Sequence, residues 1–202
     1  EFPPGPGGIG NHAFNLAKYL NLSGINTDVL TVSDFVTKEE ALRFDEKCRF
    51  SVRRHKRSAG KLKTYTDRIS EIRSAVTSGC YSHVIFSGMS SLLASLLVPK
   101  DGKKFISIAH GGDVNPANTL ERNLVNRALQ RSDLIIPVSN FSASRITAGN
   151  VGKKIKVIPN GFDLENIGEI SVPEKSLKPG TLRLISVGTV WPRKGHHNVL
   201  RV

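Results

Sequence analysis

A glycine-rich turn near the start of the chain is the first segment that could do chemistry. Residues 5–10 read Gly-Pro-Gly-Gly-Ile-Gly, which fits the G-x-G-x-x-G spacing, and an amphipathic helix is expected directly after them over 11–21. Glycines allow close approach of a phosphate, and the amides at a helix N-terminus favour an anion. The turn therefore predicts a phosphate-binding loop, although Pro6 removes one amide donor. A tight turn with a purely structural role is the alternative.

A histidine follows the apolar strand pattern in the middle of the chain. Residues 105–109 predict a buried strand, and His110 comes next, with two glycines and Asp113 behind it. In open α/β sheets, ligands bind beyond the carboxyl ends of the strands. We therefore interpret His110 as a functional residue, with a loop histidine beside two turn glycines as the alternative.

Three more segments follow predicted strands. Ser139 comes after an apolar strand and is expected to be the N-cap of the next helix. Asn160 and Gly161 form a turn signal where the first domain ends and an interdomain cleft would lie. Arg193 and Lys194 follow the last predicted strand and would point into that cleft. Two adjacent cations suit a diphosphate, because arginine binds phosphate through two nitrogens and lysine as a point charge. A solvated basic turn is the alternative.

The elements that must position these residues alternate between strand and helix patterns. Because most strand patterns are apolar throughout, they predict the α/β class: a Rossmann-like parallel sheet with flanking helices. The expected strands are 27–32, 83–87, 104–109, 133–138, 155–158 and 182–187, with a weaker one near 49–52, and the expected helices are 11–21, 60–77, 91–97, 117–130 and 141–148. In the second helix, a stripe of apolar residues is expected to pack on the sheet: Leu62, Tyr65, Ile69, Ile72 and Val76.

The order of these elements predicts one domain and the beginning of another. Prolines and glycines among polar residues over 164–180 are typical of a linker. We therefore expect a first domain over 1–163, a linker over 164–181 and the start of a second domain over 182–202. The glycine turn should be preceded by the strand that feeds it, and this first strand is expected to be missing from the sequence.

The net charge of +12 is concentrated in one part of the chain. Eight basic residues form a basic stretch: Lys47, Arg49, Arg53, Arg54, Lys56, Arg57, Lys61 and Lys63. This stretch predicts a surface attracted to anionic lipid headgroups or to nucleic-acid phosphates, with a solvated loop and helix face as the alternative. Nucleic acid is the weaker prediction, because only Phe50 and Tyr65 could stack on bases and no recognition motif is present.

Composition also argues against several classes of protein. No apolar run approaches the roughly 20 residues of a membrane span. The two cysteines, Cys48 and Cys80, lie far apart and without a histidine cluster, so neither a disulfide framework nor a metal site is expected. A reducing cytoplasm fits this pattern.

Taken in order, these segments resemble glycosyltransferase family 4, a retaining family with two Rossmann-like domains in the GT-B architecture. The resemblance rests on residues 3–10 (PPGPGGIG) followed by His12 and a Leu-Ala-x-x-Leu helix, 108–113 (IAHGGD), 138–141 (VSNF), 157–163 (VIPNGFD) and 187–195 (VGTVWPRKG). It implies transfer of a sugar from a nucleotide diphosphate sugar to a hydroxyl of a polysaccharide or glycolipid. Retained configuration is implied as well, with no metal and no other cofactor.

The resemblance also implies roles for individual residues. Gly7 and Gly8 would offer backbone amides near the donor phosphates, and His110 would sit beside the transferred sugar. Lys194 would neutralise the departing diphosphate, with Arg193 beside it.

The remaining site residues and the location of the enzyme follow from the same resemblance. Asp113, Ser139 and Asn160 would lie on the acceptor side or in the cleft. A cytoplasmic enzyme is expected, peripheral on the inner face of the membrane through the basic stretch. Thr189 stands where many members have a phosphate-binding arginine, for which Arg193 would compensate. The family's Glu-x7-Glu segment lies outside the sequence, so this chain alone is expected to be inactive.

Two other function classes stay open at this point. An NAD-dependent Rossmann oxidoreductase would use the same glycine spacing but needs an acidic residue about 20 positions on, where Asp28 comes early and Asp34 late. A non-catalytic basic module would bind anionic membrane or nucleic acid by charge, and its binding would fall steeply with salt.

Overall fold

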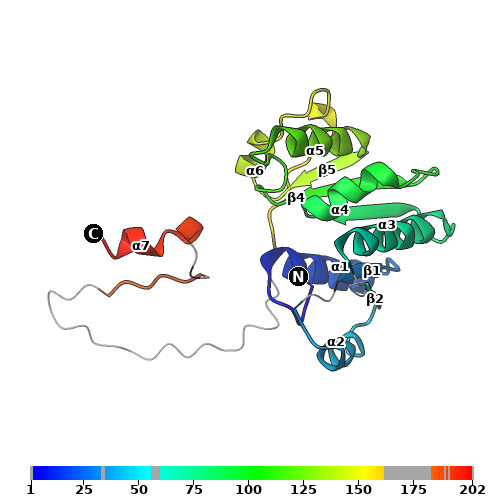
Figure 1. The fold of residues 1–202 in the computed structure, drawn as a ribbon, viewed down its shortest axis with the longest axis horizontal. Coiled ribbons are helices and arrows are strands. Elements are labelled where there is room, and N and C mark those ends of the chain that lie inside the picture. The colour runs from blue at the N-terminus through cyan, green and yellow to red at the C-terminus, as the bar shows by residue number, and fades with distance from the viewer. Residues whose placement is uncertain are drawn as a thin grey trace. The chain divides into compact units, whose positions relative to one another are not determined.

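The computed structural model describes residues 2–32, 35–55, 60–161, 183–188, 190 and 192–201 (Figure 1). Contacts within the chain divide it into two units, Glu1–Asp163 and Leu164–Val202. No helix among the described residues is long and apolar enough to cross a membrane. The predicted linker over 164–181 lies outside the described residues.

The strands of the first unit form two parallel sheets in the part of the chain that the structure describes. They are β1 (Asp28–Val32), β2 (Ser51–His55), β3 (His83–Ser87), β4 (Lys104–Ala109) and β5 (Leu134–Pro137). β1 pairs with β2, and the other sheet has the order β3-β4-β5. Residues 155–158 run beside β5, where Lys156 N donates to Ile135 O and Ile158 N to Pro137 O. The prediction of an α/β protein with parallel strands is confirmed.

Helices follow the strands as the sequence pattern predicts. They are α1 (Gly8–Leu22), α2 (Lys38–Asp45), α3 (Lys61–Thr77), α4 (Met89–Ala94) continued by η1 (Ser95–Leu97), α5 (Thr119–Arg131), α6 (Asn140–Ser144) and η2 (Gly152–Lys154). In Figure 1, α4 lies between α3 and α5 along the sheet that contains β4 and β5. The sequence analysis missed α2, although Thr37 and Glu40 form a capping box at its start.

Buried apolar side chains join these helices to the larger sheet. Leu92 of α4, Leu129 of α5 and Ile135 of β5 belong to one cluster, and Val76 of α3 and Phe105 of β4 to another. Leu129 and Ile135 are fully buried, and each such side chain contributes about 1.5–3 kcal/mol to folding. These clusters fix β3, β4 and β5 side by side, so that their carboxyl ends meet at one edge.

The apolar stripe predicted on α3 is only partly core. Val76 is buried and Ile72 packs against the same cluster, whereas Leu62 is 80% exposed and Tyr65 58% exposed. The cluster that receives α3 is built on β3 and β4 and reaches no further along the helix than Ile72. The expectation that Leu62 and Tyr65 pack on the sheet is therefore wrong.

The two sheets are joined by side chains rather than by backbone pairing. The Tyr81 hydroxyl, just before β3, donates to the Asp28 carboxylate at the start of β1, and Arg53 of β2 donates to the same hydroxyl at 3.0 Å. Each of β1 and β3 has one edge without a strand partner among the described residues. The expectation of a further strand before the glycine turn stays a prediction.

The second unit contains η4 (Pro192–Lys194) and α7 (His196–Val199) in its described part. The strand expected over 182–187 does not form in residues 183–187. Ile185 is 89% exposed and Val187 87% exposed, and no strand among the described residues pairs with this segment. That prediction is therefore wrong for residues 183–187, because an extended segment becomes a strand only when a neighbour accepts its backbone hydrogen bonds.

Candidate functional site

The glycine turn meets the carboxyl ends of β3 and β4 in the first unit. A Cβ atom placed on Gly88, directly after β3, would lie 3.5 Å from Cγ2 of Ile9 in the first turn of α1. Three residues further along α1, the ring of His12 contacts the ring of His110, which follows β4. Residues three apart lie on the same face of a helix. One face of α1 therefore holds its N-terminus over the ends of both strands.

The N-terminus of α1 is open. Gly7 is its N-cap with φ 148°, no side chain among the described residues caps the helix, and its first turn carries no acidic residue. The first amides of a helix have no acceptor within the helix and carry a partial positive charge. Gly7 is half-buried and Gly8 exposed. This geometry can receive an anion, as the glycine spacing predicts.

An arginine predicted to belong to a charged surface instead holds the glycine turn from inside. Arg54 of β2 binds both carboxylate oxygens of Asp45, at 2.7 and 2.8 Å, and donates to the carbonyl of Pro3. Its guanidinium also lies 5.5 Å from the ring centroid of Phe2, which is 3% exposed. The side chain of Arg54 is 9% exposed, so its place in an anion-attracting surface is wrong. Lys56 and Arg57 lie outside the described residues.

His110 is held by two neighbouring elements. Its Nε2 shares a hydrogen bond of 2.9 Å with the hydroxyl of Ser87, the last residue of β3. Its backbone amide donates to Oδ1 of Asp113 at 2.9 Å. Burial lowers the pKa of His110, so the ring is neutral at pH 7 and presents one donor and one acceptor nitrogen. Nδ1 has no hydrogen-bond partner among the described residues, which leaves it available to a ligand.

Asp113 closes the turn that carries His110. The side chain is 8% exposed, and its Oδ2 is buried without a hydrogen-bond partner among the described residues. Burial raises the pKa of this carboxyl group, while hydrogen bonds from the turn amides oppose that rise. Gly111 has φ 102°, and a Cβ there would lie 3.3 Å from the Ser142 hydroxyl. Asp113 therefore stabilises the conformation of the loop after β4, through its hydrogen bond with the His110 amide.

Ser139 and Asn160 differ in their surroundings. Ser139 is the N-cap of α6 and accepts a hydrogen bond of 3.0 Å from the amide of Ser142, which is the structural role expected for it. Through Ser142, it stands behind the turn at Gly111. Asn160 is exposed on the segment that follows η2, and Gly161 beside it is exposed too.

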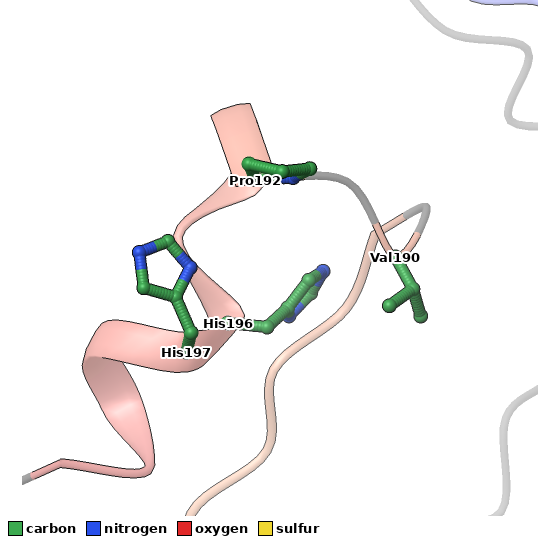
Figure 2. Close-up of a pocket in the computed structure, with 4 residues that line it drawn as sticks. All are labelled: Val190, Pro192, His196 and His197. Atoms are coloured by element: carbon green, nitrogen blue, oxygen red, sulfur yellow. The ribbon is translucent and has the colours of Figure 1, made fainter.

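The second unit carries a hollow of its own, lined by Val190, Pro192, His196 and His197 (Figure 2). His196 shares a hydrogen bond of 2.7 Å with the Ser186 hydroxyl. A Cβ on Gly188 would lie 3.3 Å from Nε2 of His196, so this glycine allows the ring to approach the backbone. Sequence reasoning missed both histidines. The only signal was their position after the Pro-Arg-Lys-Gly segment.

Of the two basic side chains predicted to bind a diphosphate, the structure describes one. Lys194 is exposed in η4, and the side chain of Arg193 lies outside the described residues, as does Thr189. No group of three or more histidine, cysteine or acidic side chains that could hold a metal ion occurs among the described residues.

The sequence profile of Glycosyltransferase Family 4 matches residues 6–166, more than half of the chain. The chain belongs to this family. The match includes the glycine turn, His110 and Ser139, and the structure brings the first two together. Asn160 also falls inside the match. Lys194 and Arg193 fall outside it.

A solved structure agrees with the family on the fold. The crystal structure of Anabaena HepE in complex with UDP and glucose superposes with a TM-score of 0.62 at 17% identity, covering 82% of this chain and 44% of that one. Staphylococcus aureus MnaA with UDP gives a TM-score of 0.40 at 14% identity, covering 66% of this chain and 44% of that one. No curated protein matches the chain. The family member described here spans less than half the length of these solved chains. Its likeness to HepE shows the α/β fold of GT-B N-terminal domains.

Proposed function

We propose that this chain is the acceptor-side part of an enzyme that transfers a sugar from a nucleotide diphosphate sugar to a hydroxyl acceptor. One observation carries the proposal within this family: the uncapped N-terminus of α1 and the neutral ring of His110 meet at the ends of β3 and β4. The N-terminus of α1 favours an anion, and the ring of His110 can form a hydrogen bond with a hydroxyl group.

The two groups would divide the work on the donor. The amides of Gly7 and Gly8 would face the diphosphate, and a negative charge at a helix N-terminus gains about 0.3–1 kcal/mol. Nδ1 of His110 would bond a hydroxyl of the transferred sugar, because Nε2 is already bonded to Ser87. Lys194, exposed in the second unit, would offset charge on the departing diphosphate. We include in the proposal retention of configuration, a metal-independent reaction and a polysaccharide or glycolipid acceptor.

One of the two candidate carboxylates of the oxidoreductase alternative is misplaced. A ribose-binding carboxylate belongs at the carboxyl end of the strand after the glycine turn, whereas Asp28 begins β1 and accepts a hydrogen bond from Tyr81. Asp34 lies outside the described residues.

Calorimetric titration with nucleotide diphosphates, their sugars and NAD tests the proposal. We expect the protein to bind one nucleotide diphosphate and its sugar. His110→Ala should weaken the sugar nucleotide about fivefold, the loss of one hydrogen bond, and leave the free nucleotide diphosphate unchanged. His83→Ala, at the opposite end of β3, is the matched control. Binding of NAD alone would refute the proposal.

We also propose a peripheral contact with anionic membrane, on the cytoplasmic face. Lys47, Arg49 and Lys63 are exposed, and Leu62 and Tyr65 are exposed beside Lys63. Basic residues near an anionic bilayer gain about 1 kcal/mol each, and apolar side chains can enter its headgroup region. Exchange of the three basic residues for glutamine should lower sedimentation with phosphatidylglycerol vesicles. Glutamine at Lys38, Lys153 and Lys156 removes the same charge elsewhere and should have little effect.

A further inference from the structure

A second histidine, which belongs to the opening motif of the resemblance, stands beside His110. His12 lies in α1, four residues after the helix begins at Gly8. Its ring centroid is 5.0 Å from that of His110, with an angle of 80° between the planes, which is an edge-to-face contact. Aromatic rings favour this arrangement. Nδ1 of His12 is buried without a hydrogen-bond partner among the described residues, so the ring acts here through packing.

Each contact to His110 restricts a different motion. Asp113 binds the backbone amide and fixes the turn, and the Ser87 hydroxyl meets Nε2. The bond to Asp113 leaves the last torsion of the ring free, which is broad and close to two-fold in histidine, and one hydrogen bond to Ser87 opposes its rotation by only about 1 kcal/mol. A ring turned by half a circle would place Cε1 beside the Ser87 hydroxyl and Cδ2 in the place of Nδ1, so both nitrogens would lose their positions. The ring of His12, packed against the imidazole, opposes that rotation.

The charges around this pair favour two neutral rings. Burial lowers the pKa of both histidines, and the neighbouring His110 lowers the pKa of His12 further. Among the described residues, the titratable group that acts on His12 is His110, and the carboxyl group of Asp113 binds the backbone amide of His110. Ser87 of β3 does not titrate in this range. A proton on His110 therefore opposes a second proton on His12.

We propose that His12 is a positioning residue that holds the imidazole of His110 in one orientation, with Nε2 on Ser87 and Nδ1 toward the ligand. The inference deepens the proposed function, because the atom so presented is the one that would bond the sugar hydroxyl. On this proposal α1 has two roles. Its N-terminus faces the anion, and His12 in its next turn orients the ring of His110.

Nitrogen NMR of the His110 ring tests the orientation without any ligand. In the 15N-labelled chain at pH 7.5, we expect the two ring nitrogens of His110 to show the distinct shifts of a single tautomer. His12→Ala should move both shifts toward a common average, because a ring that turns away from Ser87 loses the hydrogen bond that selects one tautomer. His12→Phe, which keeps a ring in place, should restore the distinct shifts. His83→Ala should leave the His110 signals as they are.

The variants also separate a local effect from a loss of fold. If His12→Ala does not fold, His12→Gln keeps the helix and removes the ring, and it should give the same averaged shifts. Unchanged His110 shifts in a folded variant without a ring at position 12 would overturn the inference.

A binding measurement then connects orientation to ligand. His12→Ala should weaken the sugar nucleotide about fivefold and leave the free nucleotide diphosphate unaffected, with His12→Phe close to the unaltered protein. Equal losses for both ligands would contradict the inference, because a misplaced His110 should affect only the sugar. If the unaltered protein binds no nucleotide while the NMR result holds, the proposed function fails and the positioning role stands.

Discussion

The hydroxyl of Ser87 and Nε2 of His110 share a hydrogen bond of 2.9 Å, and the two residues stand at the ends of neighbouring parallel strands. The bond fixes which ring nitrogen of His110 is free. Because parallel strands present their carboxyl ends at one edge, the bond also ties the site to the register of β3 and β4, in which Ser87 is opposite Ile108.

Ser87→Ala should therefore weaken the sugar nucleotide about fivefold, since Nε2 loses its partner and the ring can turn. The unfolding free energy should fall by only about 1 kcal/mol, because Ser87 is half-buried. Calorimetry and urea unfolding measure the two effects. Ser82→Ala removes the matching hydroxyl at the opposite end of β3, bonded to His83 at 2.9 Å, and should not change binding. A Ser87 variant that binds normally would count against this role.

Gly7→Ala should abolish most nucleotide diphosphate binding. The backbone at Gly7 has φ 148°, which strains any residue with a side chain by about 1–3 kcal/mol, and relief of that strain would shift the first turn of α1. Gly24, with φ 80° after the end of α1, offers a control, because alanine there is strained but touches nothing within 4 Å. Both variants should lose thermal stability, and only the first should lose binding by calorimetry. Similar binding by the two would contradict an anion site at the turn.

Arg54→Met should lower the unfolding free energy by about 3 kcal/mol, the lower end for breaking a buried ion pair. Asp45 would be left 17% exposed without its partner, and Pro3 would lose a donor. Urea unfolding measures the loss, and Arg53→Met, at an exposed neighbour, should cost much less. If Arg54 belonged to the charged surface, its replacement would weaken vesicle binding and leave stability unchanged.

Stability should fall as the pH drops below about 6.5, the ordinary pKa of histidine. Because the pKa values of His12 and His110 are lowered in the folded state, the unfolded chain binds protons more readily between about 6.5 and those values. Above pH 7 these two groups contribute no pH dependence. Thermal melts from pH 7.5 to 5.5 measure the slope, and His12→Phe should make it shallower. An equal slope in that variant would show that His12 does not titrate as described.

Asp113 provides a check of opposite sign. Its pKa is raised, so the folded state binds this proton more readily than the unfolded chain between about 3.8 and the raised value. Its contribution to stability therefore grows as the pH falls through that window. Asp113→Asn should remove this contribution to the pH dependence of stability.

Local patterns in the sequence predicted most of the framework. The strands β3 and β4 were expected at the residues where they occur, and Ser139 was expected as the helix cap that it is. Short elements were less well predicted. The helix α2 was missed, and 183–187 was expected as a strand, because a run of apolar residues does not reveal whether a neighbouring strand is present.

The sequence by itself determined the α/β class, the family and the position of His110 after a central strand, because each follows from a periodicity or a motif within a few residues. Only the tertiary structure decided that Ser87 and His12 meet His110 and that Arg54 lies inside. Ser87 is 23 residues from His110, and Arg54 reaches the Pro3 carbonyl across 51 residues. Such contacts depend on the order of strands and the packing of α1. No local pattern encodes these contacts. From the sequence around it, Ser87 is only the end of a strand, His12 only part of a helix face, and Arg54 only a charged residue in contact with water.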